Sequence, residues 1–343
     1  MAITIKDVAD AAGVSTATVS RALRGLPNVD ALTRERILSV AAELDYVISP
    51  SASSLASGRT GSVAVVTPYI ARWYFSTVLS GVESVLQSAG IDLLLMSVST
   101  PEGAIRLPPA PRLRRRVDGV LVIALPPGDP QLGDILALGL PTSLIGLALD
   151  GVASVSIDDV AAGRAAAQHL LTLGHRRIGV IRGGLSGASQ TAGQARYHGF
   201  ELAMQEANVE IDLSLQAHGH FTIEGGEQAM AALLSLPRPP TAVFAMSDEM
   251  AFGALRALRR HGLQPGADVS IIGVDGHDMS EFLDLSTVAQ PVADLGRSAA
   301  EALLVQMRSP ATGPSHRGIH LPTRLIVRGS TRAVGASTGR LEP

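Results

Sequence analysis

The sequence predicts an α/β protein in which a small, all-helical N-terminal domain precedes two doubly wound α/β lobes. Residues 1–47 read as short helices separated by tight turns. Residues 48–60 are rich in serine and separate this domain from the rest of the chain as a hinge or linker. From Gly61 onward, apolar runs of strand length alternate with helical patterns, which is typical of parallel sheets covered by helices on both faces.

The N-terminal domain begins with two helices whose ends are marked by capping and turn residues. Residues 4–10 read as the first helix, and Gly13 permits a left-handed turn after it. Ser15 is placed to cap a second helix, which runs to about Leu23. A helix, a glycine turn and a helix at this spacing form the helix-turn-helix pattern, whose second helix enters the major groove of DNA.

The second helix has an outer face of small and hydroxylated residues, which lets its backbone approach the bases in a groove about 12 Å wide. Arg21 is its one charged side chain and can reach a guanine or a phosphate. On these residues alone, a small helical hairpin that only packs is the alternative. The candidate DNA-binding residues of this region are Thr4, Ser15, Thr16, Ala17, Thr18, Ser20 and Arg21.

Six apolar runs predict strands of the lobes, and apolar residues at helical spacing over 75–90 predict one of the helices between them. Because six or more strand–helix units exceed one compact sheet, we expect two lobes over residues 61–332. The expected ranges are 61–160 and 290–321 for the N-lobe, 161–289 and 322–332 for the C-lobe, and 333–343 for a disordered tail. The predicted strands are 62–68, 91–98, 117–125, 177–183, 241–248 and 269–276.

Composition bounds the class of protein. The chain has no cysteine, which excludes disulfides, and it shows neither a signal peptide nor an apolar run of the ~20 residues that cross a bilayer. We therefore expect a soluble, cytoplasmic protein with no membrane partner. Residues 1–60 carry six basic and six acidic side chains. Any DNA affinity of this region must come from charge gathered on one face, from helix N-termini and from dimer avidity.

Seven motifs occur in one order over nearly the whole chain. They are TIKDVADAAGVSTATVSRALRG (4–25), TRERILSVAAELDY (33–46), SIDDVAAGRAAAQHLLTLGHRRIGVI (156–181), ARYHGFELAM (195–204), TAVFAMSDEMAFGALRALRRHG (241–262), DVSIIGVDG (268–276) and LPTRLIVRGST (321–331). Together they resemble the LacI/GalR family of bacterial repressors. The resemblance implies two lobes like the core of periplasmic binding proteins, a homodimer, and control by a small effector.

Residues 49–57 have the features of one short hinge helix. Ser49 is placed as its N-cap, Pro50 suits its first position and Gly58 can end it. A helix of about eight residues is too short to be stable alone in water, so we expect it to fold only when it is held. The resemblance implies that DNA and the partner's hinge hold it, and that Leu55 is an apolar wedge in a minor-groove step. A flexible linker is the alternative.

The lobes are expected to bind a small molecule in a cleft beyond the carboxyl ends of their strands. The resemblance implies that Arg196, at the start of a helix, and Asp275, at the end of a strand, hold the hydroxyl groups of a sugar-like effector. An aromatic ring would cover the apolar face of the sugar. Asp248 is expected to cap the helix that follows it. The candidate effector-binding residues are Trp73, Phe75, Arg196, Ser247 and Asp275.

Other patterns give weaker signals. His218 and His220 lack a third ligand, so we expect no metal site. The segment RLRRR (112–116) either contacts DNA or, as we favour, forms a basic helix end that complements the macrodipole. The Pro-rich stretch 107–115 predicts a surface loop. No nucleophile elbow, catalytic triad, Walker loop or dinucleotide fingerprint is present, and we predict neither an enzyme nor a cofactor.

These observations predict an effector-gated transcriptional repressor of sugar-utilisation genes, which binds a pseudo-palindromic operator in double-stranded DNA as a homodimer. The alternative from another class is a sugar-binding or sugar-processing protein whose helical N-terminus is incidental. A third interpretation is a regulator gated by a partner protein or by a phosphorylated metabolite.

Overall fold

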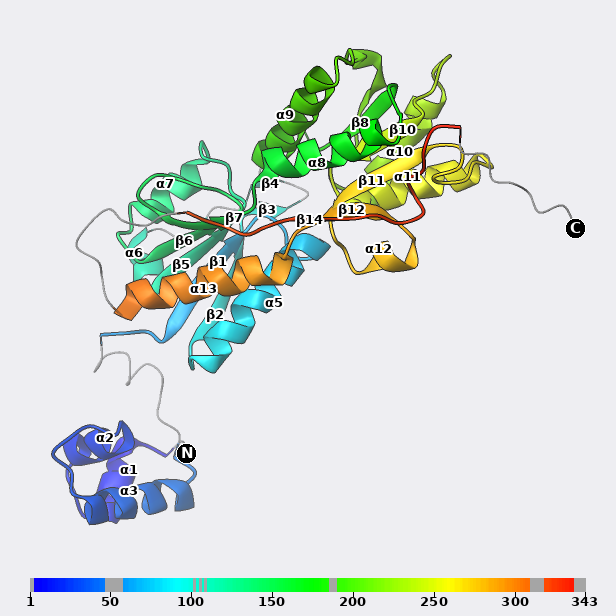
Figure 1. The fold of residues 1–343 in the computed structure, drawn as a ribbon. Coiled ribbons are helices and arrows are strands. Elements are labelled where there is room, and N and C mark those ends of the chain that lie inside the picture. Colours follow the sequence, from blue (N-terminus) through cyan, green and yellow to red (C-terminus); the bar gives the residue numbers. More distant parts are fainter. Residues whose placement is uncertain are drawn as a thin grey trace, which may run out of the picture. The chain divides into compact units, whose positions relative to one another are not determined.

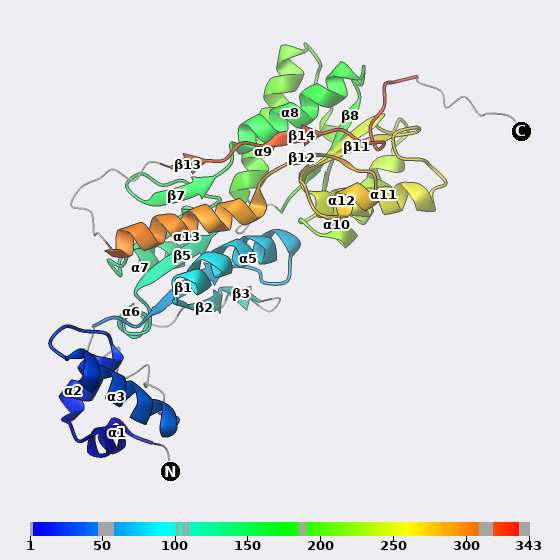
Figure 2. The same ribbon diagram turned by 60° about the horizontal axis from the view of Figure 1, so that its bottom comes forward.

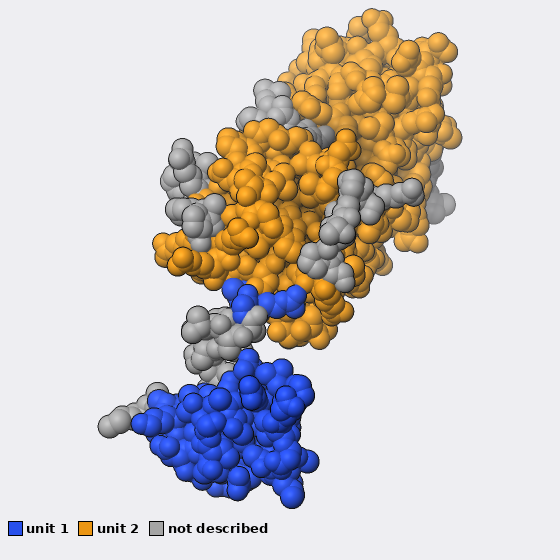
Figure 3. Space-filling model, turned by 90° about the vertical axis from the view of Figure 1, so that its left-hand side faces the viewer, with its two compact units in different colours: residues 1–61 blue, residues 62–343 orange. Residues whose placement is uncertain are grey.

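The computed structural model describes residues 3–46, 58–100, 103–104, 107, 110–184, 190–308 and 318–335. The chain forms two compact units, Met1–Gly61 and Ser62–Pro343, which are coloured separately in Figure 3. The predicted hinge helix, with Leu55, and residues 336–343 of the predicted tail lie outside the described residues. Among the described residues, no helix is long and apolar enough to cross a membrane.

The first unit contains helices α1 (Ile5–Ala12), α2 (Thr16–Leu23) and α3 (Ala31–Glu43). The predicted helix-turn-helix is confirmed, although α1 ends two residues later than expected. Gly13 has a φ of 66° and forms the left-handed end of α1. The side chain of Ser15 accepts a hydrogen bond from the Thr18 N–H at the start of α2.

The three helices of the first unit enclose a small apolar core. Val8, Val19 and Ile37, one from each helix, have no exposed surface. Arg34 of α3 holds the end of α2 and the turn that follows it. Its guanidinium donates hydrogen bonds to the carbonyls of Ala22 at 2.9 Å and Leu26 at 2.7 Å. These contacts fix the angle at which α2 presents its outer face.

The second unit is built on two six-stranded sheets, one in each lobe (Figures 1 and 2). The first sheet is parallel and has the order β13-β7-β6-β5-β1-β2. Its strands are β1 (Ser62–Thr67), β2 (Asp92–Ser97), β5 (Gly119–Ile123), β6 (Thr142–Ile145), β7 (Ala153–Ser156) and β13 (Ile319–His320). A two-stranded ribbon of β3 (Ser99–Thr100) and β4 (Gly103–Ala104) follows β2.

The second sheet has the order β14-β12-β11-β10-β8-β9, and its edge strand β14 is antiparallel to β12. Its strands are β8 (Ile178–Arg182), β9 (Gln216–His218), β10 (Ala242–Ala245), β11 (Ser270–Asp275), β12 (Ser286–Ala289) and β14 (Arg324–Ile326). The fold is therefore the predicted pair of doubly wound lobes.

Helices cover the sheets of both lobes (Figure 1). The first lobe has α5 (Trp73–Ser88), α6 (Ala110–Arg114), α7 (Pro130–Leu136) and α13 (Val292–Arg308). The second lobe has α8 (Asp159–Thr172), α9 (Gln190–Glu206), the short 3₁₀ helix η1 (Leu213–Leu215), α10 (Ile223–Leu234), α11 (Asp248–Arg260) and α12 (Met279–Phe282). In the described part of the chain, the lobes exchange strands and helices at β7–α8, β12–α13 and β13–β14.

The first sheet buries alternate residues of one strand in two different cores. Val63 and Val65 of β1 pack in the core that contains α5, whereas Ala64 and Val66 pack in the core that contains Leu113 of α6. This confirms the expectation that strands with continuous apolar sequence are covered on both faces. Strand β2 is the exception, because it lies at the sheet edge and is only partly buried.

Three local expectations differ from the structure. The Pro-rich segment predicted as a loop contains α6, whose Leu113 is 1% exposed and anchors it to the sheet. Arg196 does not begin a helix, because α9 starts at Gln190 and places Arg196 in its second turn. The tail was expected to be disordered from residue 333, but residues 333–335 are described. The Val334 N–H in this part donates to the Leu173 carbonyl at 3.0 Å.

Three helix pairs cross so closely that backbone meets backbone. At each crossing, a methyl group on a glycine of one helix would overlap a carbonyl oxygen of the other. Side chains larger than hydrogen would push the helices apart, so the glycines set the spacing of the layers. The reciprocal glycines are Gly81 and Gly296 in α5 and α13, Gly163 and Gly199 in α8 and α9, and Gly226 and Gly253 in α10 and α11.

Substitution of Gly163 by alanine tests this constraint. The added methyl group would overlap the Arg196 carbonyl, so we expect Gly163→Ala to lower the free energy of unfolding by about 1–3 kcal/mol or more. The matched control is Gly133→Ala in α7, where a methyl group meets nothing within 4 Å and alanine favours the helix by about 0.5–1 kcal/mol. Urea unfolding measures both. Equal effects of the two changes would contradict the close crossing.

Candidate functional site

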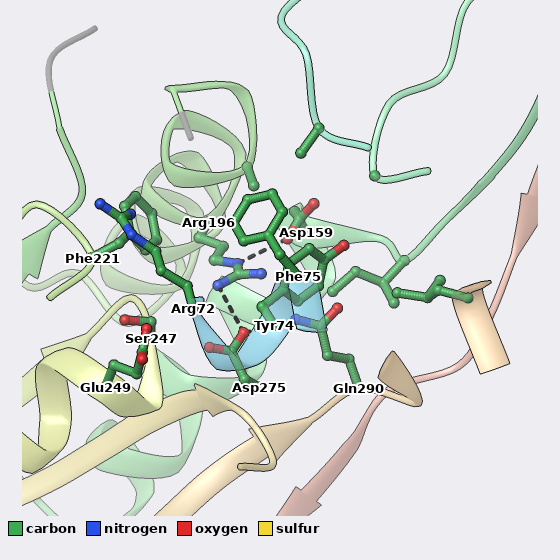
Figure 4. A pocket seen from close by; sticks show the side chains of 15 residues that line it. Arg72, Tyr74, Phe75, Asp159, Arg196, Phe221, Ser247, Glu249, Asp275 and Gln290 are labelled. Carbon is green, nitrogen blue, oxygen red and sulfur yellow. Dashed lines mark hydrogen bonds and ion pairs between the residues drawn. The ribbon is translucent and has the colours of Figure 1, made fainter. Parts of the chain in front are cut away.

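A cavity lies between the two lobes, at the carboxyl ends of the strands of both sheets (Figure 4). Ala124 and Gly146 line it just after β5 and β6 of the first sheet, and Ser247 and Gln290 line it just after β10 and β12 of the second. This position suits one small molecule held by both lobes.

Arg196 lies at the centre of the cavity wall and is 5% exposed. Its Nε donates to Asp159 Oδ1 at 2.8 Å, and its Nη1 lies 3.5 Å from Asp275 Oδ1 (Figure 4). The same Nη1 donates to the Met246 carbonyl at 2.6 Å. The sequence-predicted pair of Arg196 and Asp275 therefore meets, and Asp159 joins it as a partner that was not predicted. Asp159 was detectable in the motif SIDDVAAG, where it begins the helix after β7.

The charges of this cluster are set by burial. Burial lowers the pKa of Arg196, but Asp159 and Asp275 outweigh this effect and raise it, so the guanidinium stays charged. Burial raises the pKa of Asp275 to about 7, although the Arg196 cation acts in the opposite direction. The Gln290 side chain also donates to Asp275 Oδ1, at 2.7 Å. The cavity thus presents a fixed cation beside a carboxyl group that titrates near neutral pH.

Asp248 does not cap the following helix, contrary to the sequence prediction. Ser247 is the N-cap of α11, and its side chain accepts a hydrogen bond from the Met250 N–H. Asp248 is fully buried and accepts from two N–H groups and two hydroxyl groups at 2.7–2.9 Å. It therefore holds the loop after β11, directly beside Asp275. The donors are Gly276, His277, Ser280 and Thr287.

Aromatic side chains from both lobes face the cavity. Phe75 and Tyr74 enter from the first lobe and Phe221 enters from the second (Figure 4). Burial raises the pKa of the Tyr74 phenol, and Asp159 adds to this effect, so the hydroxyl stays neutral. The Phe221 ring lies against Gly183, where a methyl group would overlap it. Tyr74 and Phe221 were not predicted, and Tyr74 is adjacent to two residues that were.

Backbone strain gathers around the cavity. Three non-glycine residues that line it have positive φ angles, namely Ala124 at 52°, Phe221 at 54° and Asp275 at 136°. Such conformations cost about 1–3 kcal/mol each and persist only where the surroundings impose them. The strain at Asp275 is imposed by β11 on one side and by the loop held by Asp248 on the other.

Two further charged side chains line the cavity. Glu249 in the first turn of α11 and Arg72 before α5 both line the cavity, one from each lobe. Burial raises the pKa of Glu249, while Arg72 opposes that rise. The Arg72 guanidinium also lies 3.7 Å from the centre of the Tyr69 ring.

Trp73 is not among the described residues that line the cavity, although it was predicted to bind the effector. Its indole Nε1 donates to Asp278 Oδ2 at 3.1 Å, and its ring stacks on His277 with the ring centres 4.4 Å apart. The Phe252 ring packs edge-on against the same His277 ring. Trp73 therefore joins the start of α5 in the first lobe to the loop before α12 in the second.

The predicted DNA-binding residues lie along the outer face of the first unit. Ser15, Thr16, Ala17 and Arg21 are exposed, and Thr18 and Ser20 are partly exposed. Thr4 is also exposed, but it forms a capping box with Asp7, to which its hydroxyl donates at 2.7 Å.

The two histidines that were weighed as metal ligands stack with their ring centres 6.3 Å apart, at His218 and His220. The described residues contain no group of three or more side chains that could hold a metal ion.

A helix-turn-helix unit followed by two doubly wound lobes with a cavity between them is the architecture of a DNA-binding transcriptional regulator. Two family models match the chain: bacterial regulatory proteins of the lacI family over residues 4–49, and the periplasmic binding protein-like domain over residues 167–331. The transcriptional repressor CytR of Escherichia coli is 34% identical over 97% of each chain, and the ribose operon repressor of Haemophilus influenzae is 32% identical over 95% of this chain and 98% of the relative. The chain belongs to the LacI family of bacterial regulatory proteins.

Solved structures agree with this assignment. The lac repressor dimer bound to operator and an anti-inducer has a TM-score of 0.83 at 26% identity and covers 97% of this chain and all of the other. A LacI-family regulator from Enterococcus faecium with bound ribose has a TM-score of 0.70 at 30% identity, over 80% of this chain and 99% of the other. The relatives are transcriptional repressors rather than enzymes, and this chain is a DNA-binding transcriptional regulator.

The raised pKa of Asp275 predicts a dependence of stability on pH. The folded chain keeps a proton on Asp275 up to about pH 7, whereas the unfolded chain releases it near the ordinary pKa of an aspartate, 3.8. Protonated Asp275 therefore stabilises the folded chain at low pH. The free energy of unfolding should decrease as pH rises from about 3.8 to about 7, by up to about 1.4 kcal/mol per pH unit.

The measurement is urea unfolding of the wild type and of Asp275→Asn at pH values across the window. Asparagine cannot ionise, so the wild type should lose stability relative to the variant as pH rises through the window. A difference that is constant between pH 4 and 7, or that changes with the opposite sign, would show that the carboxyl group is ionised throughout.

Proposed function

We propose that this chain represses transcription as a homodimer on a pseudo-palindromic operator, and that a neutral sugar or related polyol in the cavity controls its DNA binding. The observation that carries the proposal is the buried Arg196, held between Asp159 and Asp275 at the junction of the lobes. A charged group in such a position is costly unless it is paired, and it is a common means of fixing a polar ligand.

The cavity has the chemistry for hydroxyl groups. The Asp275 carboxyl group accepts hydrogen bonds and the Arg196 guanidinium donates them, so adjacent hydroxyls of one ligand can satisfy both. Gln290 adds an amide at the same place. Phe75 and Phe221 offer apolar surface for the C–H face of a sugar ring. The effector contacts we propose are therefore Phe75, Arg196, Phe221, Asp275 and Gln290, with Ser247 at the edge of the cavity.

The charge of the cavity favours a neutral ligand over a phosphorylated one. Three carboxyl groups line it, at Asp159, Asp275 and Glu249, against the two cations Arg196 and Arg72. Arg196 already has three acceptors around it. A phosphate would therefore find no uncommitted cation at the centre of the wall.

Relatives support this class of effector. One similar structure contains ribose, and another, a CelR regulator with a TM-score of 0.69 at 32% identity, is a complex with cellobiose. The relatives also include the ribose operon repressor. We propose a monosaccharide or a related polyol on the chemistry of the lining, and a ligand screen identifies the particular compound.

We propose that effector and DNA communicate through the arrangement of the lobes. Because the cavity walls come from both lobes, a ligand that contacts Phe75 and Arg196 favours the lobe arrangement in which both are within reach. A dimer would hold the two hinges, residues 49–57, side by side in one arrangement only. A differential of a few kcal/mol would then order or melt a helix of this length.

The operator follows from the symmetry of a dimer. Two identical helix-turn-helix units related by a two-fold axis require a pseudo-palindrome with half-sites about one helical turn apart. The lac repressor was solved as a dimer bound to operator. We propose that Leu55 of each chain inserts into a central step of the operator. Selection of bound sequences from a random pool reveals the operator, and direct-repeat sequences would contradict the dimer model.

Replacement of Arg21 separates reading of bases from attraction to phosphates. Arg21→Ala should weaken binding to the selected operator by about 1–3 kcal/mol and should affect random DNA little, because a base-edge contact is specific. Arg36→Ala on the exposed side of α3 is the matched control. Binding titrations on both DNAs measure the effects. If Arg21→Ala weakens binding to operator and to random DNA equally, the residue contacts phosphate only.

Replacement of Asp275 tests the effector site. A thermal-shift screen over sugars, polyols and nucleosides first identifies the effector, because a ligand of the folded state raises the melting temperature. Asp275→Asn should keep operator binding and lose most of the change in operator affinity that the effector causes in the wild type. Asp134→Asn, which alters an exposed carboxyl group on α7 that does not line the cavity, is the matched control. A variant at Asp275 that responds fully would place the effector elsewhere.

A further inference from the structure

We propose that the arginines of residues 112–116 bind DNA phosphates beside the helix-turn-helix unit, so that the first lobe itself is part of the DNA-binding surface. The inference goes beyond the effector gating proposed above and rests only on DNA binding by the N-terminal unit. It assigns a partner, the sugar-phosphate backbone of double-stranded DNA, to a surface of the second unit.

The segment is built to present positive charge to solvent. Leu113 and Val117 are each 1% exposed and anchor it in the core of the first lobe. The four arginines between and around them are exposed, and no described carboxyl group lies within ion-pair distance of any of them. They are Arg112, Arg114, Arg115 and Arg116.

A helix macrodipole does not account for this cluster. Helix α6 has five residues, and Arg112 and Arg114 lie in its last turn. Arg115 and Arg116 follow the helix, although the dipole acts mainly within the last turn. Four guanidinium groups within five residues repel one another, so a purely structural role would not select them.

The position of the cluster connects it with DNA. Residues 112–116 lead into β5 at the amino end of the first sheet, where the Asp118 N–H donates to the Ser62 carbonyl at 2.8 Å. Ser62 is the first residue of the second unit, so the chain that comes from the DNA-binding unit enters the lobe at this same end. The effector cavity lies at the carboxyl ends of the strands, at the opposite end of the sheet. Figures 1 and 2 show α6 at the end of the first lobe that is remote from the second lobe.

The side chains of the N-terminal unit bring no net positive charge to DNA. Its six basic and six acidic side chains cancel within residues 1–60, whereas DNA binding draws much of its free energy from cations that displace counterions. The segment adds four guanidinium groups per chain next to the tether that carries the DNA-binding unit. Arginine is well suited to phosphate because its planar fork donates two hydrogen bonds at once.

The test compares two triple variants of the full-length chain. Arg114, Arg115 and Arg116 are replaced by glutamine in one variant. The control variant replaces three exposed arginines of the second lobe by glutamine, namely Arg238, Arg259 and Arg324. Both variants therefore lose three positive charges per chain. Fluorescence anisotropy gives the affinity for a labelled random-sequence duplex over a series of salt concentrations. Sedimentation measures the dimerisation of both variants.

The wild-type slope of log affinity against log salt should become less steep by about 0.9 for each phosphate that the variant no longer neutralises. The loss of three phosphate contacts by one chain would change the slope by about 2.7, and their loss by both chains of a dimer by about 5.4. The control should keep the wild-type slope. The inference is overturned if both triple variants change the slope alike, if neither changes it, or if the first variant alters dimerisation and leaves the slope unchanged. A wild-type chain that binds no DNA would instead refute the proposed function itself.

Discussion

A buried guanidinium group is the interaction on which the second unit depends. A charge removed from water costs several kcal/mol unless its partners are in place, so Arg196 requires Asp159, Asp275 and the Met246 carbonyl to meet at one point. These partners come from α8, β11 and the end of β10, and Arg196 itself comes from α9. The glycine crossing of α8 and α9 lets the two helices lie close enough for this pairing, because the carbonyl of Arg196 rests directly on Gly163.

The same constraint orients the cavity, which lies at the opposite end of the first sheet from the point where the chain enters the lobe. Asp275 is held in a strained conformation by the loop that Asp248 fastens, so its carboxyl group is fixed before any ligand arrives. In a parallel sheet all strands point one way, so the two ends of the first lobe carry different chemistry. The carboxyl ends face the cavity, and the amino ends receive the chain from the helix-turn-helix unit.

The sequence sufficed to predict the helix-turn-helix, the long buried strands and the meeting of Arg196 with Asp275. The sequence did not predict strands β6, β7 and β12. Each is four residues long and contains serine or threonine, so it lacks an apolar run, and its pairing with neighbouring strands determines its structure. Asp248 was misassigned because its partners lie about thirty residues away in the sequence. Trp73 and Phe75 both follow β1 in the sequence, so both were predicted to bind the effector. They are two residues apart on α5, which places their side chains about 200° apart around the helix axis, and of the two only Phe75 lines the cavity.

The contact of Trp73 with the loop at His277 and Asp278 gives the molecule a built-in optical reporter. Trp73 is the single tryptophan among 343 residues, so the intrinsic indole emission of the chain arises at one point. That point is a stacked and hydrogen-bonded junction between the two lobes, outside the described lining of the cavity. A change in lobe arrangement therefore alters the surroundings of the only indole without any label, while a ligand in the cavity need not touch it.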